Sequence, residues 1–333
     1  MSDEKIVVSL LDQQDSSAWD DFVNNSNNGT IFHKLKFQKY HAEGRFEFHN
    51  LVFKRNNKIV ALLPGYIKDK AFISPAGASY GGPILKSCKF SAFEEVVDAF
   101  LQYCQDNQIE EIYITPPPLP YLKEEHQNLE FILEYKGFKK SKTLISNCSD
   151  LDFFNKFNSD DEIKSFINKK NSAALSKAYR FDCTIEINED YENFYPLLLE
   201  NKKKFDATPT HSLEELKNLA QLFPKEFKLF MAYNDKKEAV AGILVVACNS
   251  KSALIFYISQ DYDYQEHRIV NRLLYEIILW SRKNNFHRLD IGVSVDTSHE
   301  NPIEPSRNLI FFKERVANTH GFTRSTFHKK INE

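Results

Sequence analysis

The sequence from Ala253 to Ser294 reads ALIFYISQDYDYQEHRIVNRLLYEIILWSRKNNFHRLDIGVS. Residues 253–259 are rich in aromatic and β-branched side chains and predict a buried strand, and residues 288–293 predict another. Between them, apolar residues at helical spacing predict a helix: Ile269, Leu273, Leu274, Ile277, Ile278 and Trp280. A strand, a helix and a parallel strand form a crossover unit, which places ligands at the carboxyl ends of its strands.

A polar loop follows the second of these strands and leads to NLIFFKERV, residues 308–316. A loop of this length after a strand's carboxyl end is more often a functional element than a plain connector. Lys313 comes just beyond it, in an apolar frame formed by Phe311 and Phe312. The sequence therefore directs attention to Lys313.

The composition limits what this unit belongs to. With 333 residues, 42% of them hydrophobic, the chain predicts two α/β domains. A net charge of -3 gives no sign of DNA binding, and five scattered cysteines favour reduced thiols without metal-ligand spacing. The amino-terminal residues are charged, and no apolar run is long enough for a membrane span. We expect an unexported cytoplasmic protein without a bound metal.

The two halves repeat one order of elements. Residues 50–63 predict a hairpin that turns at Asn56 and Asn57, and residues 227–246 predict a second one with a polar tip. In each half a strand, an amphipathic helix and another strand follow, with helices at 92–105 and 269–283. We interpret this order as a tandem duplication, with one domain at 1–150 and the other at 151–333.

Residues 159–204 form the most basic part of the chain and predict a helical linker at the start of the second domain. It ends in Lys202, Lys203 and Lys204. One interpretation is a solvated helical face, because runs of charge usually are. The other is a surface where Lys203 and Lys204 contact substrate phosphates.

Several motifs resemble the Fem-type transferases, which are tandem acetyltransferase-like proteins of the GNAT superfamily. The motif Asn271-x-Leu-Leu-x-Glu-x-x-x-Trp280 is followed by Leu289 to Ser294 and then by Phe312-Lys313. Residues 30–33 and the Tyr80-Gly-Gly-Pro turn match first-domain landmarks. The likeness covers nearly the whole chain, in order. It implies two GNAT domains, each a mixed sheet with helices on both faces.

The resemblance also implies transfer of an acyl or aminoacyl group to an amine of a cell-envelope or nucleotide-linked precursor. The acceptor would be a muropeptide-like molecule with phosphate groups, and the donor aminoacyl-tRNA or acyl-CoA, with no tightly bound cofactor. Two features depart from the family. The long charged helical arm of some members is absent, and residues 265–271 lack the glycines that cradle a pyrophosphate in acyl-CoA enzymes.

Two residues are candidates for the chemistry. Aminolysis needs stabilisation of an oxyanion and a path for protons. The resemblance gives Lys313 the first role, whereas a lysine that only extends from an amphipathic helix is the alternative. Tyr257 is a candidate hydrogen-bond donor or proton relay, and the alternative, which its place in the strand favours, is a core aromatic residue.

Further candidates for binding substrate are Tyr80, Arg268, Asn271, Asp290, Ser294 and Phe312. Asp290 has a plainer alternative, because an aspartate at a strand end often caps the next segment or pairs with an arginine. Asn271 has one too, in a role at the helix start. For the whole chain, an acyl-CoA-dependent N-acetyltransferase and a non-catalytic GNAT scaffold remain open beside the Fem-like transferase.

Overall fold

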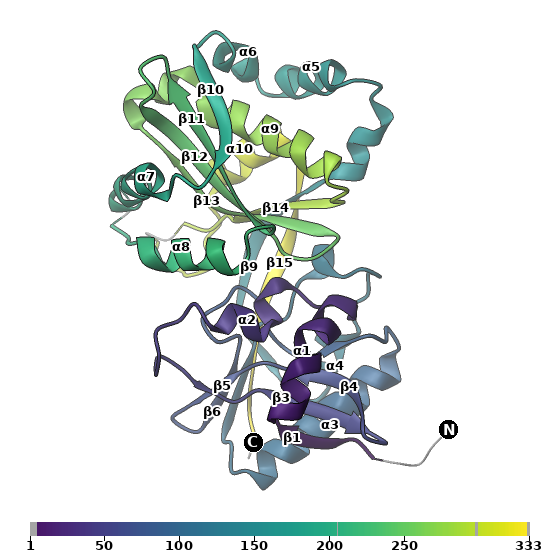
Figure 1. Ribbon diagram of the computed structural model, residues 1–333. Coiled ribbons are helices and arrows are strands. Elements are labelled where there is room, and N and C mark those ends of the chain that lie inside the picture. Colours follow the sequence, from purple (N-terminus) through teal and green to yellow (C-terminus); the bar gives the residue numbers. More distant parts are fainter. Residues whose placement is uncertain (1–4, 205, 297–298, 332–333) are drawn as a thin grey trace. The chain divides into compact units, whose positions relative to one another are not determined.

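The computed structural model describes residues 5–204, 206–296 and 299–331, which fall into two compact units (Figure 1). Unit 1 comprises residues 1–144 and 323–333, and unit 2 comprises residues 145–322. Both combine helices with mixed sheets, which confirms the predicted α/β class. The charged residues 1–4, on which part of the expected location rested, lie outside the described residues.

The elements follow in chain order. Unit 1 contains β1 (Val7–Leu10), α1 (Gln13–Asn25), η1 (Ile31–His33), α2 (Leu35–Gln38), β2 (Glu47–Phe48), β3 (Leu51–Arg55), β4 (Lys58–Leu63), β5 (Tyr66–Lys68), β6 (Ala71–Ser74), β7 (Ile84–Leu85), α3 (Phe90–Asp106), β8 (Glu111–Ile114), η2 (Leu119–Tyr121) and α4 (Asn128–Tyr135). Unit 2 contains η3 (Leu151–Lys156), α5 (Asp160–Lys170), α6 (Ala174–Ala178), β10 (Cys183–Asn188), α7 (Tyr191–Lys203), α8 (Leu213–Leu222), β11 (Phe227–Asn234), β12 (Ala239–Ala247), β13 (Ser252–Gln260), η4 (Tyr262–His267), α9 (Ile269–Lys283), β14 (Arg288–Val293) and α10 (Arg307–Ala317). Two long strands, β9 (Lys139–Asp150) and β15 (Thr319–Lys330), contribute residues to both units.

The predicted repeat is present. In unit 1 a strand and helices precede the β3–β4 hairpin, and β6, α3 and β8 follow it. Unit 2 has the same order in β10, α7, α8, the β11–β12 hairpin, β13, α9 and β14. The strands β6 and β8 are paired in parallel, as are β13 and β14, so each unit contains a crossover. The first hairpin turns at Asn56 and Asn57, both at positive φ, as a tight two-residue turn requires.

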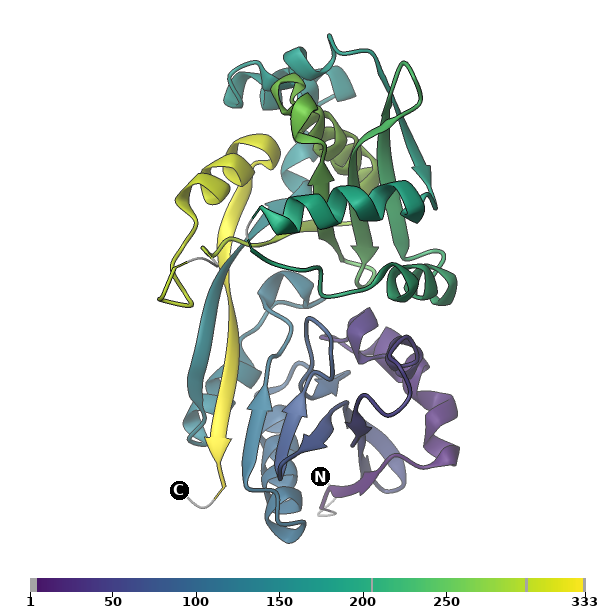
Figure 2. The same cartoon turned by 90° about the vertical axis from the view of Figure 1, so that its left-hand side faces the viewer.

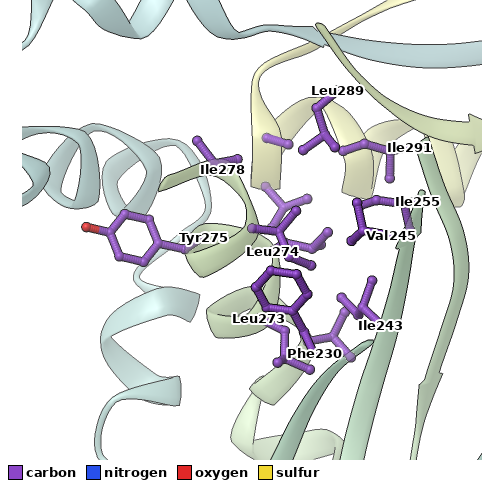
Figure 3. Packing of buried hydrophobic residues seen from close by; sticks show 14 of the residues in the cluster. Phe230, Ile243, Val245, Ile255, Leu273, Leu274, Tyr275, Ile278, Leu289 and Ile291 are labelled. Carbon is purple, nitrogen blue, oxygen red and sulfur yellow. The ribbon is translucent and has the colours of Figure 1, made fainter. Parts of the chain in front are cut away.

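The sheet of unit 2 has the order β10-β11-β12-β13-β14-β9, with helices on both faces (Figures 1 and 2). Successive residues of a strand point to opposite faces. On β11, Phe230 joins the core beneath α9, which is shown in Figure 3. Met231 points the other way, where a Cβ on Gly242 would lie 2.6 Å from both the Met231 sulfur and the Phe194 ring of α7. Thus α9 covers one face and α7 the other.

The core of unit 2 rests on the apolar stripe of α9. Leu273, Leu274, Ile277 and Ile278 have no exposed surface, and they pack against β11, β12 and β13 (Figure 3). Burying a side chain of this size stabilises the fold by about 2 kcal/mol. The helical spacing read from the sequence is therefore the spacing of the core, and α9 holds β13 and β14 in place.

Two sequence-based boundaries need correction. Residues 159–204 are not a purely helical linker, because Cys183–Asn188 form β10, which pairs antiparallel with β11 as the outer strand of unit 2. Apolar and polar residues alternate along β10, which is typical of a strand, and the lysines around it conceal this pattern. The predicted domain limits, 1–150 and 151–333, also differ from the two units. The end of β15 returns to unit 1, where Phe327 pairs with Ile114 of β8.

Candidate functional site

Strands β13 and β14 separate at their carboxyl ends. Their parallel pairing runs from Ser252 opposite Arg288 to Leu254 opposite Asp290 and stops there in the described strands. One residue further along β13, its pairing with β12 is irregular: Leu244 faces Tyr257 while Val245 faces Ile255, which leaves one extra residue on β13. Such a bulge bends a strand and redirects its side chains. The separation opens the sheet where α/β folds bind ligands.

Asp290 shapes the end of β14. Its buried carboxylate accepts hydrogen bonds from the Gly292 backbone N–H at 2.7 Å and from the Ser146 hydroxyl at 3.0 Å. Gly292 has a φ of +76°, a conformation that side chains rarely adopt. A Cβ at Gly292 would lie 3.7 Å from the Ile255 carbonyl oxygen of β13. The predicted alternative for Asp290, a structural role at the strand end, matches these contacts, and contact with substrate stays a prediction.

Lys313 extends from α10 to the same strand end. Its side chain is 3% exposed, and Nζ donates to the Gly292 carbonyl at 2.7 Å, the Val293 carbonyl at 3.0 Å and the Ser294 hydroxyl at 2.8 Å. Burial lowers the pKa of Lys313 from 10.5 to about 8, and the nearby Asp290 carboxylate opposes that shift. An ammonium group has three N–H donors, so all three are engaged here. The lysine is thus a buried cation at the end of β14, not one that extends into solvent.

Ser294 links Lys313 to β9. The hydroxyl of Ser294 accepts from Lys313 and donates to the Asn147 side-chain oxygen at 2.6 Å, while its backbone N–H donates to the Ile145 carbonyl. The side-chain NH₂ of Asn147 is buried and has no acceptor among the residues that the structure describes. Sequence reasoning placed Ser294 on the substrate. The structure places its side chain in this interior network, which positions Lys313.

Tyr257 has a partner that sequence analysis missed. Its hydroxyl and Nδ1 of His211 lie 2.8 Å apart, and the His211 carbonyl accepts a hydrogen bond from Tyr195. Burial raises the pKa of Tyr257, although hydrogen bonds with Thr210 and His211 oppose this. His211 is buried and directly precedes the capping residue of α8. An isolated histidine in a polar turn carries no sequence signal for this contact, because its partner lies 46 residues away.

The basic end of α7 lies beside the carboxyl end of β13. The Asn201 side chain donates to the Gln260 carbonyl at 2.6 Å. Beyond it, the Lys202 ammonium lies 5.9 Å from the centre of the Tyr257 ring, and the Lys204 ammonium lies 3.0 Å from the centre of the Tyr262 ring. Lys203 is exposed. Of the two lysines predicted to contact phosphates, Lys204 therefore lies over Tyr262 and Lys203 is exposed, while Lys202 is the one beside Tyr257. Their ligand stays a prediction.

The start of α9 adds two further predicted residues. Arg268 is exposed and caps the helix in the left-handed conformation, with φ of +61°, where glycine is usually favoured. Asn271, one turn later, is buried. The turn before α9 contains no glycine, yet Arg268 adopts there the backbone conformation that glycine usually supplies.

Two predicted residues lie elsewhere. Tyr80 belongs to unit 1, where its buried ring packs against Tyr121 and beneath the Arg324 guanidinium, with 4.8 and 4.9 Å to the ring centre. Phe312 packs against the core of unit 2. The predicted residues near the separated strands therefore form two groups: Lys313, Ser294 and Asp290 at the end of β14, and Tyr257 with the lysines of α7 near the end of β13. Within the described ranges, no group of histidine, cysteine and carboxylate side chains is arranged to hold a metal ion. The helices described there include none long and apolar enough to cross a membrane.

Comparison with solved structures identifies the fold. FemX matches over 98% of both chains with a TM-score of 0.69 and 13% identity. A tandem GNAT protein from the clavulanic acid biosynthesis pathway matches 98% of this chain and 99% of its own, with a TM-score of 0.53 and 10% identity. The C-terminal domain of a protein assigned as a lysylphosphatidylglycerol synthetase from Agrobacterium fabrum covers 95% of this chain and 91% of its own, with a TM-score of 0.54 and 13% identity. No protein-family model and no curated protein matches the sequence. The fold is therefore that of the tandem GNAT proteins, as the sequence predicts.

Proposed function

We propose that this chain is a Fem-like N-acyltransferase that joins an acyl or aminoacyl group to an amine of a cell-envelope or nucleotide-linked precursor. The observation that carries the proposal is the separation of β13 from β14 with Lys313 buried at its edge. The resemblance of the sequence motifs and the fold shared with FemX support the same class of reaction. The proposed site lies in unit 2.

The reaction requires little covalent participation by the protein. A neutral amine attacks the carbonyl carbon of an ester or thioester, a tetrahedral oxyanion forms, and the carbon–oxygen or carbon–sulfur bond breaks as the amide forms. The amine loses a proton, and the leaving oxygen or sulfur gains one. We assign this proton path to the Tyr257–His211 pair, because its 2.8 Å contact joins two groups that both donate and accept.

Lys313 is assigned to the oxyanion. Its charge is partly desolvated, which strengthens its attraction for a developing negative charge. Direct contact requires the oxyanion to replace one present acceptor. The Ser294 hydroxyl is the acceptor that loses least, because it keeps its own donation to Asn147. The two carbonyls of β14 then hold the ammonium in place.

Two classes of molecule are candidates for the donor. An aminoacyl ester is favoured by the absence of glycines in residues 265–271, since side chains block a close approach to a pyrophosphate. Acyl-CoA is the second candidate, and the left-handed backbone of Arg268 favours it, because that conformation is the one that glycine usually supplies. Lys202 and Lys204, beside Tyr257 and Tyr262, provide positive charge for the phosphates of either donor or acceptor.

The test is a transfer assay with a radiolabelled donor. Aminoacyl-tRNA and acetyl-CoA are each offered with a panel of nucleotide-linked muropeptides, and the amide product is separated and counted. A thermal-shift screen selects the pairs, since a ligand of the native state raises its stability. Amide formation with one donor and one acceptor is expected. A chain that binds these ligands and forms no amide under any pairing is a scaffold, and the proposal fails.

Lys313→Met provides the specific control. It retains most of the apolar stem, and losing one preorganised contact to an oxyanion costs on the order of 100- to 1000-fold in turnover. Lys313→Arg is expected to restore activity only partly, because a planar guanidinium does not reproduce a compact ammonium. If Lys313→Met turns over at the wild-type rate, the assignment of Lys313 is wrong.

A further inference from the structure

A groove lies on the α9 face of the unit 2 sheet. It has a volume of about 690 Å³ and lies between one side of α9, strands β10 and β11, and the start of α5. Tyr257 and His211 are on the other face, with α7 and α8. None of the residues assigned to the transfer, Lys313 included, lines the groove, so the two sites share no residue.

Two arginines give the groove its chemistry. Arg272 donates through Nη1 to the Cys183 carbonyl at 3.2 Å, and its guanidinium lies 4.6 Å from the centre of the Tyr179 ring. Arg282 lies on the same helix, and its ion pair with Asp160 has a long nitrogen–oxygen distance of 3.8 Å. The Nε–H groups of both arginines are buried, and neither has an acceptor within the described part of the chain. A ligand in the groove meets the Nη groups first. A reorientation of a guanidinium group toward the ligand that also gives Nε–H an acceptor removes a cost of about 1–3 kcal/mol.

The carboxylates that line the groove do not meet this need. Glu276 accepts a hydrogen bond from the Tyr179 hydroxyl at 3.0 Å. Asp160 stands 3.8 Å from Nη1 of Arg282, which is beyond hydrogen-bond distance, and its side chain is 67% exposed. Lys283 adds a further positive charge to the lining. Three cations face two carboxylates, so the groove carries a net positive charge.

The rest of the lining is apolar. Trp280 is partly exposed and packs edge to face on Phe230, with 5.7 Å between ring centres. Ile185 and Ile187 of β10 border the groove, and Ile187 is 47% exposed, which is unusual for an isoleucine in a strand. An apolar surface beside two guanidinium groups suits a molecule with one anionic end and one apolar end.

We propose that this groove is a binding site for a small amphiphilic anion, a carboxylate or a phosphate monoester that carries an aromatic or short aliphatic group. The anionic end contacts Arg272 and Arg282 and takes the place that Asp160 now approaches. The apolar end lies on Trp280 and the isoleucines of β10. Guanidinium groups bind both anions in a two-pronged geometry, so the two chemistries share one site.

Binding is tested on the full chain by calorimetry with three probes: octanoate, octyl phosphate and octanol. Saturable binding of one or both anions, at least about tenfold tighter than that of octanol, is expected from a charged hydrogen bond. Tryptophan fluorescence locates the ligand. The chain has two tryptophans, and Trp19 is wholly buried in unit 1. The emission change should therefore come from Trp280 and be absent in Trp280→Phe.

Three variants test whether the anion binds at the two arginines. Arg282→Gln should weaken binding of the anions about tenfold, whereas Arg180→Gln, which removes the same charge from an exposed site outside the groove, should leave it unchanged. Asp160→Asn removes the competing carboxylate and should tighten binding about two- to fivefold. The tightening cannot arise from a damaged fold. Equal affinity for octanol and octanoate, or equal effects of Arg282→Gln and Arg180→Gln, would overturn the proposal.

Discussion

Lys313 shows how much a residue's function depends on distant partners. Its position in an apolar frame is readable from the sequence, but its three acceptors come from Gly292, Val293 and Ser294, about twenty residues earlier. Those contacts decide that the ammonium faces the end of β14. His211 is the opposite case, because nothing in its own neighbourhood distinguishes it from a surface histidine. Local sequence patterns can identify single candidate residues. Contacts between residues far apart in the sequence can be found only from the structure.

The buried charge of Lys313 makes stability depend on pH. Its pKa is about 8 in the folded chain and 10.5 when unperturbed, so between these values the unfolded chain binds the extra proton. Stability therefore rises with pH across that interval. The expected gain of wild type relative to Lys313→Met is up to about 3 kcal/mol. Denaturant unfolding of both proteins at pH 7.5 and 10.5 measures it, and a difference that stays constant with pH would show that the lysine keeps an ordinary pKa.

The hydroxyl of Tyr257 is tested by its removal. Tyr257→Phe keeps the ring beneath Lys202 and deletes the contact with His211. If the pair moves the proton, turnover should fall on the order of 100-fold while KM changes little. Tyr195→Phe is the matched control, because it removes a hydroxyl that donates to the backbone carbonyl of the same histidine. Equal losses in both variants would indicate that Tyr257 only positions His211.

At the scale of elements, periodic segments were predictable and mixed ones were not. The α9 stripe, the turn at Asn56 and Asn57 and the parallel β13–β14 pair all follow from local spacing. Strand β10 was missed, because its six residues of alternating apolar and polar type lie within a lysine-rich stretch whose overall composition favours helix. The separation of β13 and β14 could not be predicted from the sequence either. It depends on the bulge opposite Leu244 and on the contacts of Asp290, neither of which has a sequence signature.

The first turn of α9 offers a direct test of donor choice. Arg268 holds a left-handed backbone at a cost that glycine does not incur, so Arg268→Gly should stabilise the chain by up to about 1 kcal/mol. It also removes the side chain that we expect to hinder the approach of a pyrophosphate to this turn. Calorimetry should show tighter acetyl-CoA binding in Arg268→Gly than in Arg268→Ala, which clears the side chain but not the strain. No measurable acetyl-CoA binding in either variant would leave the aminoacyl donor as the better candidate.

At the scale of the whole molecule, the duplication was predictable and the division of the chain was not. The repeated order of hairpin, strand, helix and strand identified two α/β halves. The pairing partner of the last strand could not be predicted, because the sequence pattern of a strand does not indicate which other strand it pairs with. Phe327 is wholly buried in the unit 1 core beside Ile114, more than 200 residues earlier.

Phe327→Ala should consequently destabilise unit 1 by about 3–5 kcal/mol, the usual cost of emptying a core aromatic site. The tryptophans report the two units separately, since Trp19 is in unit 1 and Trp280 in unit 2. In single-tryptophan versions of the variant, made with Trp280→Phe or Trp19→Phe, the unfolding midpoint reported by Trp19 should fall further than that reported by Trp280. Equal shifts would mean that the whole chain unfolds in one cooperative step.

The return of residues 323–331 to unit 1 also sets an order of events on the ribosome. Synthesis delivers the first 144 residues early, but the strand that pairs with β8 emerges only after all of unit 2. Throughout that interval the edge of β8 has unsatisfied backbone donors and acceptors, which invite pairing with other chains. The amino-terminal unit is thus begun first and finished last, so its nascent form is the stage at which chaperones would have most to protect.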